Sequence, residues 1–390
     1  MPLTTPHRAR GSGGDVRYPC RVALDVGREP SHQPPRAGRV RRLLILGAVV
    51  LALAVGVAAT ILRHESREPS EAAGPPVHRT QSPSPRVPHP PYRAFEARSW
   101  WNSPLPRDAP TDAQAAQVLG YLRTAPDNAG GCLHLAGAER SPWGQPVYWA
   151  RPDDTRYDVT GVSGGGPPEL SDLRIPPGAR PADNSDGSMT IFDLRAGYVT
   201  LLTDARYDAP SDRWSASGAT VTYLDSNGLD ARTGLSDNPD NTGTHRGNNG
   251  AVSVVRLDEV RAGAVDHVLK VSSGPELSAR WVFPMTGSDG DGPADNPDIP
   301  PEGLRLRIKP SVDLSQLGLR PEALVIAQAL QTYGMYLGDS GGATALKLED
   351  TAVEGRGQLW DVTTKSLCDL PFTPAYWDVL PEGYDPSATR

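Results

Sequence analysis

The feature that most constrains the fold is a strand pattern that begins at Gly303 and ends at Pro310. Three apolar residues alternate with three cationic ones: Leu304, Arg305, Leu306, Arg307, Ile308 and Lys309. A period of two is typical of a β-strand whose successive side chains point to opposite faces. Proline cannot donate a hydrogen bond to a neighbouring strand, so Pro310 ends the pattern. The sequence therefore predicts a strand with one apolar and one cationic face.

An apolar helix is expected directly after this strand. Pro321 suits the first helical turn and Gly334 suits the C-terminal end. The apolar residues 335–337 then predict a short buried strand, and residues 339–342 predict a Gly-rich turn. Residues 343–348 are expected to return as the partner strand. This segment predicts one helix packed on a β-sheet.

The rest of the chain is rich in short strand signals. These lie at residues 146–150, 189–194, 197–203, 214–224, 251–256, 265–272 and 280–283. A second helix is expected at residues 111–123, where the apolar residues have helical spacing. The chain contains 40 glycines and 40 prolines, which favours β structure rich in loops. We expect a mainly β fold, similar to a β-sandwich or jelly roll, with one or two helices.

The order of these segments resembles a family of secreted or membrane-anchored bacterial proteins of about this size. Members share the cationic strand, an apolar helix that ends in Tyr-Gly, and an Asp-containing Gly-rich turn. Residues 255–260, 266–269 and 299–305 follow the same order upstream. The resemblance covers about residues 95–350 and implies a β-rich fold and a location outside the cytoplasm. No activity is established for this family, and the chain departs from it at residues 186–188, where relatives often have a histidine.

A membrane anchor is predicted near the N-terminus. Residues 43–62 form a run of twenty residues without a charge, long enough to cross a bilayer. Four arginines precede the run closely, so residues 1–42 are expected to be a disordered cytoplasmic segment. Residues 63–92 read as a Pro-rich linker and residues 93–390 as an extracytoplasmic β-rich domain. A cleaved signal peptide is the alternative interpretation of the apolar run.

Net charge limits the possible binding partners, and the cysteines predict a disulfide. The formal net charge is −7, and because residues 1–92 carry +7, the extracytoplasmic domain carries −14. Such an acidic domain argues against nucleic acid as a partner. Cys132 and Cys368 are the two cysteines on the outer side of the predicted membrane span, so they are expected to form a disulfide.

Asp339 is the first candidate for a catalytic residue. It lies in the Gly-rich segment after an apolar strand, where rigidity and exposure are expected together. His267, which follows Asp266 at the start of an apolar strand, is the candidate helper. The chain has no nucleophile elbow, phosphate-binding loop, HExxH pattern or dinucleotide-binding fingerprint. Turn hydrogen bonding for Asp339 and a backbone hydrogen bond for His267 are the structural alternatives.

Candidate ligand-binding residues lie in the long polar segment 228–250. His245, Arg246 and Asn248 belong to it, and so long a loop in a compact domain favours a binding role. Trp214 is a further candidate, because tryptophans such as Trp143, Trp149 and Trp214 stack on sugar rings when they are exposed. Core packing is the alternative for each tryptophan.

A calcium ion is the one cofactor that the sequence suggests. Asp289, Asp291 and Asp295 have the oxygen-rich spacing of a calcium loop, although the glutamate that usually completes such a loop is absent. A solvated acidic loop is the alternative. Taken together, these features predict a membrane-anchored extracytoplasmic protein that recognises or processes cell-envelope or environmental glycan. A non-catalytic surface scaffold is the competing function.

Overall fold

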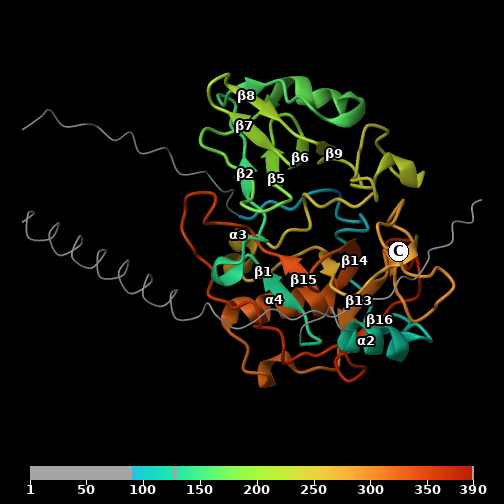
Figure 1. Ribbon diagram of the computed structural model, residues 1–390. Helices are drawn as coiled ribbons and strands as arrows, with labels where there is room; N and C mark the ends of the chain where they lie inside the picture. Colours follow the sequence, from blue (N-terminus) through green and yellow to red (C-terminus); the bar gives the residue numbers. More distant parts are fainter. Residues whose placement is uncertain (1–89, 126–129, 389–390) are drawn as a thin grey trace, which may run out of the picture. The chain divides into compact units, whose positions relative to one another are not determined.

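The computed structural model describes residues 90–125 and 130–388. The predicted cytoplasmic segment, the predicted membrane span at residues 43–62 and all but the end of the predicted linker lie outside the described residues. Within the described residues, no helix has the length and hydropathy needed to cross a bilayer. The described chain is β-rich with few helices, as predicted (Figure 1).

A six-stranded sheet forms one half of the domain. Its strand order is β1 (His134–Ala136), β15 (Ala345–Lys347), β10 (Leu269–Ser273), β14 (Met335–Ser340), β13 (Arg305–Ile308) and β16 (Trp377–Val379). β1 pairs with β15 in parallel, as β10 does with β14, and the other neighbours are antiparallel. The sheet is therefore mixed, and its neighbours come from distant parts of the chain.

The α-helices of the described residues accompany this sheet (Figure 1). They are α2 (Ala115–Thr124), α3 (Leu257–Ala262) and α4 (Pro321–Thr332). α4 begins at the predicted proline and buries Ile326, Ala327 and Leu330 in a cluster that also holds Leu306 and Ile308 of β13. Full burial of a large apolar side chain such as leucine or isoleucine stabilises the fold by about 1.5–3 kcal/mol. The predicted helix on a sheet is thus confirmed.

A four-stranded sheet forms the other half. Its order is β2 (Val147–Trp149), β5 (Met189–Asp193), β6 (Tyr198–Thr203) and β9 (Gly218–Tyr223). Three small two-stranded sheets pair β3 (Arg156–Tyr157) with β4 (Leu173–Arg174), β7 (Arg206–Asp208) with β8 (Arg213–Ser215), and β11 (Ser278–Trp281) with β12 (Pro301–Glu302). Short 3-10 helices occupy Ala138–Arg140, Ser163–Gly165, Pro168–Asp172, Ala231–Thr233 and Leu314–Gln316.

An aromatic cluster packs between the two larger sheets. Tyr336 of β14 makes edge contacts with Trp100 and Trp101, with ring centroids 5.4 and 5.6 Å apart. On the side of the four-stranded sheet, Trp149 stacks on Phe192 with centroids 4.5 Å apart. All five side chains belong to one buried cluster. Aromatic packing therefore holds the two larger sheets against each other.

The predicted cationic face of β13 is buried rather than solvated. Arg305 donates to the carbonyl oxygens of Tyr333 and Ser103 and lies over the Trp100 ring, 4.7 Å from its centroid. Arg307 donates to the Asp378 carboxylate 3.2 Å away. The segment before α2 covers this face, and its carbonyl groups satisfy guanidinium donors that would otherwise lose their hydration.

Three details of the predicted architecture are wrong. The strand order does not follow a jelly roll, whose pairs are antiparallel, because β1–β15, β10–β14 and β2–β5 are parallel. Residues 251–256 form a turn that leads into α3, and only Val255 makes an isolated bridge. β15 pairs with β1 and β10 instead of returning beside β14. Each difference depends on contacts between distant segments.

Candidate functional site

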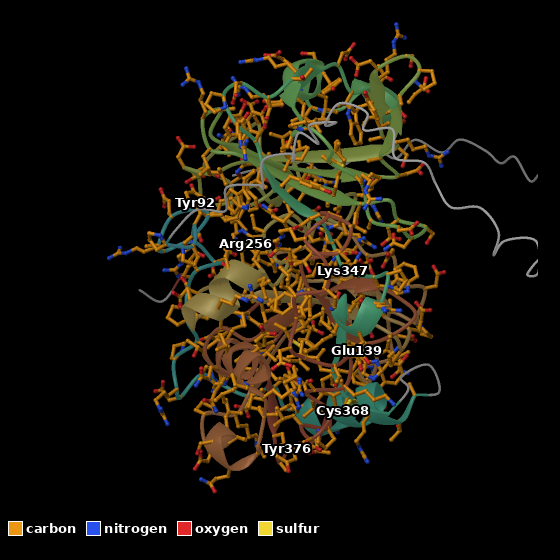
Figure 2. All side chains as sticks on the ribbon, turned by 90° about the vertical axis from the view of Figure 1, so that its left-hand side faces the viewer. Tyr92, Glu139, Arg256, Lys347, Cys368 and Tyr376 are labelled. Atoms are coloured by element: carbon orange, nitrogen blue, oxygen red, sulfur yellow. A yellow bond between two sulfur atoms is a disulfide. The ribbon has the colours of Figure 1, made fainter. Side chains whose placement is uncertain are left out.

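Two adjoining cavities lie beside the C-terminal end of β14. One has a volume of about 420 Å³ and the other about 450 Å³. Asp186, Asp339, Ser340 and Lys347 line both of them. We call the first the Trp143 cavity, the second the Arg246 cavity, and the two together the cleft. Figure 2 labels Lys347, which lies at the level where the two larger sheets meet.

The Trp143 cavity has a partly apolar lining. It includes Leu135 and Ala136 of β1, Ala345 of β15 and the backbone of the Gly-rich segment 341–342. Trp143 is 45% exposed, which is unusual for so large an apolar side chain. The cavity therefore presents an accessible aromatic ring beside polar groups.

The Arg246 cavity is strongly polar. Its hydroxyl and amide side chains are Gln145, Ser185, Ser188, Thr203, Ser217, Thr244, Asn248 and Ser340. Its charged side chains are Asp186, Asp204, Asp289, Asp339, Arg246, Lys270 and Lys347. The lining therefore carries both signs of charge and offers both hydrogen-bond donors and acceptors.

Asp339 is the centre of the ion pairs in this cleft. Its Oδ1 atom lies 2.6 Å from Arg246 Nη1, and its Oδ2 atom accepts from Lys270 Nζ at 2.9 Å. Arg246 also pairs with Asp289, whose Oδ1 accepts from the Ser340 backbone N–H at 3.1 Å. Asp339 was expected in a turn, but it lies within β14, whose ladder extends through Ser340. The strand holds the carboxylate rigidly between two cations.

The surroundings of this network shift the pKa values of Asp339 and Glu302 in opposite directions. Burial opposes ionisation of Asp339, but Lys270 and Arg246 overcome it and hold the Asp339 pKa well below its ordinary value. Burial lowers the pKa of Lys270, against the opposing effect of Asp339. Burial, helped by the charge of Asp339 and opposed by Arg246, raises the pKa of Glu302 to about 7. Asp339 is therefore ionised at neutral pH, whereas Glu302 titrates there.

Glu302 lies behind the cleft wall. Its Oε1 atom accepts from the Asp289 backbone N–H at 3.0 Å, and the residue is fully buried. It is absent from the lining of both cavities. Glu302 therefore contacts the Asp289 backbone and interacts electrostatically with Arg246, but it does not contact a ligand in the cleft.

Several buried polar atoms of the cleft have no hydrogen-bond partner within the part of the chain that the structure describes. They are Arg246 Nε, Asn248 Oδ1, Thr244 Oγ1, Ser188 Oγ and Ser340 Oγ. Buried polar groups are almost always hydrogen-bonded, because an unmade bond costs about 1–3 kcal/mol. Water or a ligand is needed to complete them. This concentration of unpaired atoms makes the cleft the candidate binding site.

Backbone contacts hold the Arg246 loop in place. Asn248 Nδ2 donates to the Gly338 carbonyl of β14 at 2.8 Å, and the Arg246 carbonyl accepts from Thr286 N–H at 2.8 Å. Gly247 has a φ of 84° and lies against the Thr286 backbone, so a side chain there would be strained. The loop therefore presents Arg246 and Asn248 from a fixed backbone.

The structure brings only part of the predicted site together. Asp339, Arg246 and Asn248 line one cavity. His245 follows Thr244 in the same loop but is exposed, and its side chain is absent from the lining of both cavities. Its carbonyl accepts from Arg232 at 3.2 Å.

The predicted helpers of Asp339 lie elsewhere. His267 is buried, with Nδ1 2.9 Å from the Val268 carbonyl and Nε2 3.4 Å from Glu259. Asp266 is exposed and accepts from the Tyr333 hydroxyl at 3.4 Å. Neither residue lines the cleft, so the structure does not support a catalytic group of Asp339 with His267 and Asp266. His267 matches the structural alternative of a backbone hydrogen bond.

Trp214 occupies the core beside the four-stranded sheet. It is 3% exposed and packs against Tyr207, with ring centroids 5.2 Å apart. Its indole ring has no face open to a ligand. The prediction that Trp214 contacts a ligand gives way to its alternative of core packing, and Trp143 is the exposed tryptophan of the cleft.

The predicted calcium site is not assembled. Asp289, Asp291 and Asp295 do not form a group of carboxylates close enough to share one ion within the described residues. Asp289 instead pairs with Arg246, while the Asp291 backbone N–H donates to Glu276 at 2.7 Å. The spacing in the sequence is compatible with calcium, but the chain directs Asp289 toward the Arg246 guanidinium.

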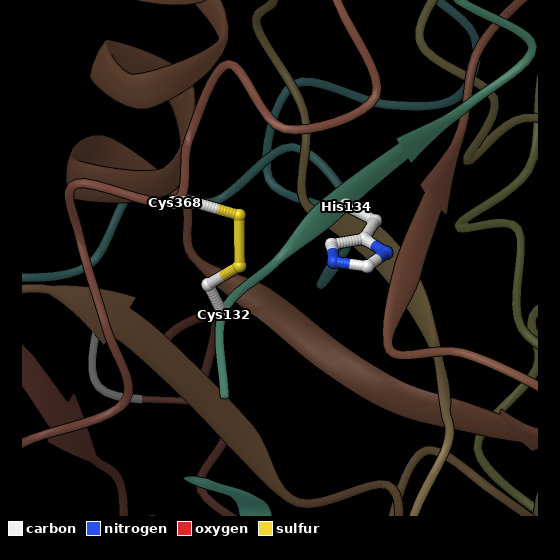
Figure 3. A group of neighbouring side chains, drawn as sticks. All are labelled: Cys132, His134 and Cys368. Atoms are coloured by element: carbon white, nitrogen blue, oxygen red, sulfur yellow. A yellow bond between two sulfur atoms is a disulfide. The ribbon is translucent and has the colours of Figure 1, made fainter. Parts of the chain in front are cut away.

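The predicted disulfide between Cys132 and Cys368 is present, with 4.9 Å between the Cα atoms. Figure 3 shows the His134 ring beside it. The two sulfur atoms and a His134 nitrogen lie within 4.8 Å of one another. Because each sulfur is bonded to the other, neither is a thiolate that could hold a metal ion. The bond joins the segment before β1 to the C-terminal part of the chain.

Sequence reasoning missed Lys270 and Lys347, and it considered Asp186 and Glu302 among many acidic residues without assigning them to the predicted site. Lysine is rare in this chain, and Lys270 and Lys347 each interrupt an apolar strand pattern, which was a signal available in the sequence. Asp186 lies in a loop whose partner, Lys347, is 161 residues away, so only the fold reveals the pair. No protein-family model, curated protein or solved structure matches the chain.

Proposed function

We propose that the cleft binds saccharide, and that the protein is an extracytoplasmic glycan-recognition module anchored by residues 43–62. The observation that carries this proposal is the exposed Trp143 ring beside a cavity lined with hydroxyl, amide and paired charged groups. Sugars offer an apolar ring face and many hydroxyl groups, so an accessible aromatic ring and converging polar side chains match both features.

Recognition is favoured over turnover by the state of Asp339. Both of its carboxylate oxygens are paired with cations, and its pKa is held below the ordinary value. Such a group is a poor general acid or base near neutral pH. It is well suited to orient Arg246 and Lys270 and to accept hydrogen bonds from hydroxyl groups.

Binding by the full-length chain in detergent tests this proposal. Isothermal titration calorimetry against envelope and plant polysaccharides and their fragments should show saturable binding. Asp339→Asn should weaken it at least tenfold, because Arg246 and Lys270 lose the charge that positions them. Asp361→Asn is the matched control, since Asp361 also pairs with an arginine but is 70% exposed on its side chain. Silence across the panel would overturn the proposal and leave a surface scaffold as the function.

Glycan hydrolysis is the second candidate, favoured by one observation. Glu302 titrates near pH 7 while Asp339 is ionised, and such a separation is typical of an acid paired with an ionised carboxylate. The burial of Glu302 opposes it, because the carboxyl group does not line the cleft. Reducing ends released by the wild type but not by Glu302→Gln would establish hydrolysis. Saturable binding without products would establish recognition alone.

A further inference from the structure

We infer that the ligand is an uncharged oligosaccharide of at least two sugar units, with one unit in each cavity. This inference rests on the proposed function and specifies its ligand. It follows from three properties of the cleft: the shared wall, the difference in lining between the cavities, and the balance of charge.

The shared wall shows that one ligand can occupy both cavities. Asp186, Asp339, Ser340 and Lys347 line the two, and Lys347 Nζ lies 3.0 Å from Asp186 Oδ2. The side chains of this pair are 23% and 43% exposed, so both reach solvent in the cleft. Each cavity lies within the size range of small-molecule sites, about 300–1,000 Å³. A linkage between two sugar units would therefore lie over the Asp186–Lys347 pair.

The two cavities favour different contacts. The Trp143 cavity combines an exposed indole with Leu135, Ala136 and Ala345, which suits the apolar face of a sugar ring. The Arg246 cavity holds Arg246 Nε, Asn248 Oδ1 and Thr244 Oγ1, which are buried and lack partners within the described chain. These atoms suit the hydroxyl groups of a second ring. One unit would be held by stacking and the next by hydrogen bonds.

The charges of the cleft oppose a polyanionic ligand. Three cations line it, namely Arg246, Lys270 and Lys347, and they face the carboxylates of Asp186, Asp204, Asp289 and Asp339. Each cation already has a carboxylate partner at ion-pair distance. A uronate would compete with these carboxylates, whereas a neutral sugar can hydrogen-bond to both members of a pair without charge displacement.

The test measures affinity against chain length with the full-length protein in detergent. The probes are neutral oligosaccharides of glucose and of N-acetylglucosamine with one to six units, and oligogalacturonates of the same lengths. We expect affinity to rise at least tenfold from one unit to two or three and to change little beyond. We expect oligogalacturonates to bind more weakly than the neutral series.

Trp143→Ala tests the contribution of the Trp143 cavity to affinity. Trp281→Ala is its matched control, because Trp281 is 50% exposed and lies outside the cleft. Trp143→Ala should remove most of the gain with length, leave the affinity for one unit within about twofold, and leave the thermal midpoint unchanged. Trp281→Ala should change neither.

Equal affinity for one and three units would overturn the inference while leaving the proposed function intact. A preference for oligogalacturonates would do the same. A Trp143→Ala variant that binds all lengths like the wild type would overturn the inference and would also contradict the aromatic contact on which the proposed function rests. Absence of binding to every saccharide would instead contradict the proposed function itself.

Discussion

The Asp339 network and a second network around Glu354 are both built from buried charges, but they differ in their surroundings. In the second network, Arg356 lies 2.7 Å from Glu354 Oε2 and also pairs with Glu349. Glu354 accepts from the Val147 backbone N–H at 2.8 Å, and Glu349 accepts from the Leu257 N–H at 2.7 Å. These bonds tie β2 of the four-stranded sheet and the start of α3 to the segment after β15.

The difference lies in access and in the number of unpaired atoms, because the Glu354 network holds one such atom within the described chain, Arg356 Nε. Neither Glu349 nor Glu354 lines either cavity of the cleft, and their side chains are at most 5% exposed. Asp339 and Arg246 border a cavity and lie among polar atoms that lack partners within the described chain. Buried charge alone therefore does not identify a binding site. Open volume and unsatisfied hydrogen-bonding groups beside the charge do so.

Removal of Arg356 should produce the largest loss of stability. Arg356→Ala removes the cation shared by the buried Glu349 and Glu354 carboxyl groups. Loss of one partner of a buried ion pair costs up to about 3–5 kcal/mol. Urea unfolding followed by tryptophan fluorescence measures the change. Saccharide affinity of the folded fraction should stay within about twofold, because Arg356 does not line the cleft.

The control is Arg206→Ala, which breaks the exposed pair with Asp204. An exposed pair contributes about 0–1 kcal/mol, so this variant should unfold near the wild-type midpoint. Equal losses for Arg206→Ala and Arg356→Ala would show that the Glu354 network does not stabilise the fold more than a surface pair does.

The pH dependence of stability should differ between the two networks. Burial and the neighbouring Glu349 raise the pKa of Glu354 to about 9. The folded state therefore keeps a proton that the unfolded state releases near pH 4.5, so wild-type stability falls as the pH rises toward 9. Glu354→Gln cannot ionise in either state, so it should remove most of this fall, up to about 4 kcal/mol between pH 6 and 9.

Glu302→Gln tests the same pH dependence at the second carboxyl group with a raised pKa. Because the Glu302 pKa is about 7, the variant should reduce the fall in stability up to about pH 7 and have little effect above it. Urea midpoints at pH 5, 7 and 9 for the wild type and both variants provide the measurement. Identical pH profiles for all three proteins would contradict the assignment of raised pKa values to these two carboxyl groups.

Local patterns in the sequence predicted much of the secondary structure. The apolar periodicity after Pro321 predicted α4, and the strand signals at residues 189–194 and 197–203 predicted β5 and β6. The Cys132–Cys368 disulfide followed from the number of cysteines on one side of the predicted membrane span. These features depend on neighbouring residues or on simple counting, so a single sequence contains them.

Contacts between distant segments could not be read in this way. The alternation in β13 correctly predicted a strand with a cationic face, but it did not show that Arg305 is buried against Trp100, 205 positions away in the chain. Asp339 was selected for its place beside glycines, whereas its partners Arg246 and Lys270 come from other segments. The period of a strand shows which residues share a face, but not which segment will cover that face.

The smallest effect on stability is expected at the Asp186–Lys347 pair, which lies in both cavities. Lys347→Met keeps the aliphatic stem but removes a partly exposed charge, so the free energy of unfolding should fall by less than about 1 kcal/mol. Saccharide affinity should nevertheless fall at least fivefold, because the ammonium group would donate to the linkage between the two sugar units. Calorimetry and urea unfolding on the same preparation measure both quantities. A variant that loses stability but keeps its affinity would reverse the contrast between the networks, since the cleft would then use its charges to hold the fold together, as the Glu354 network does.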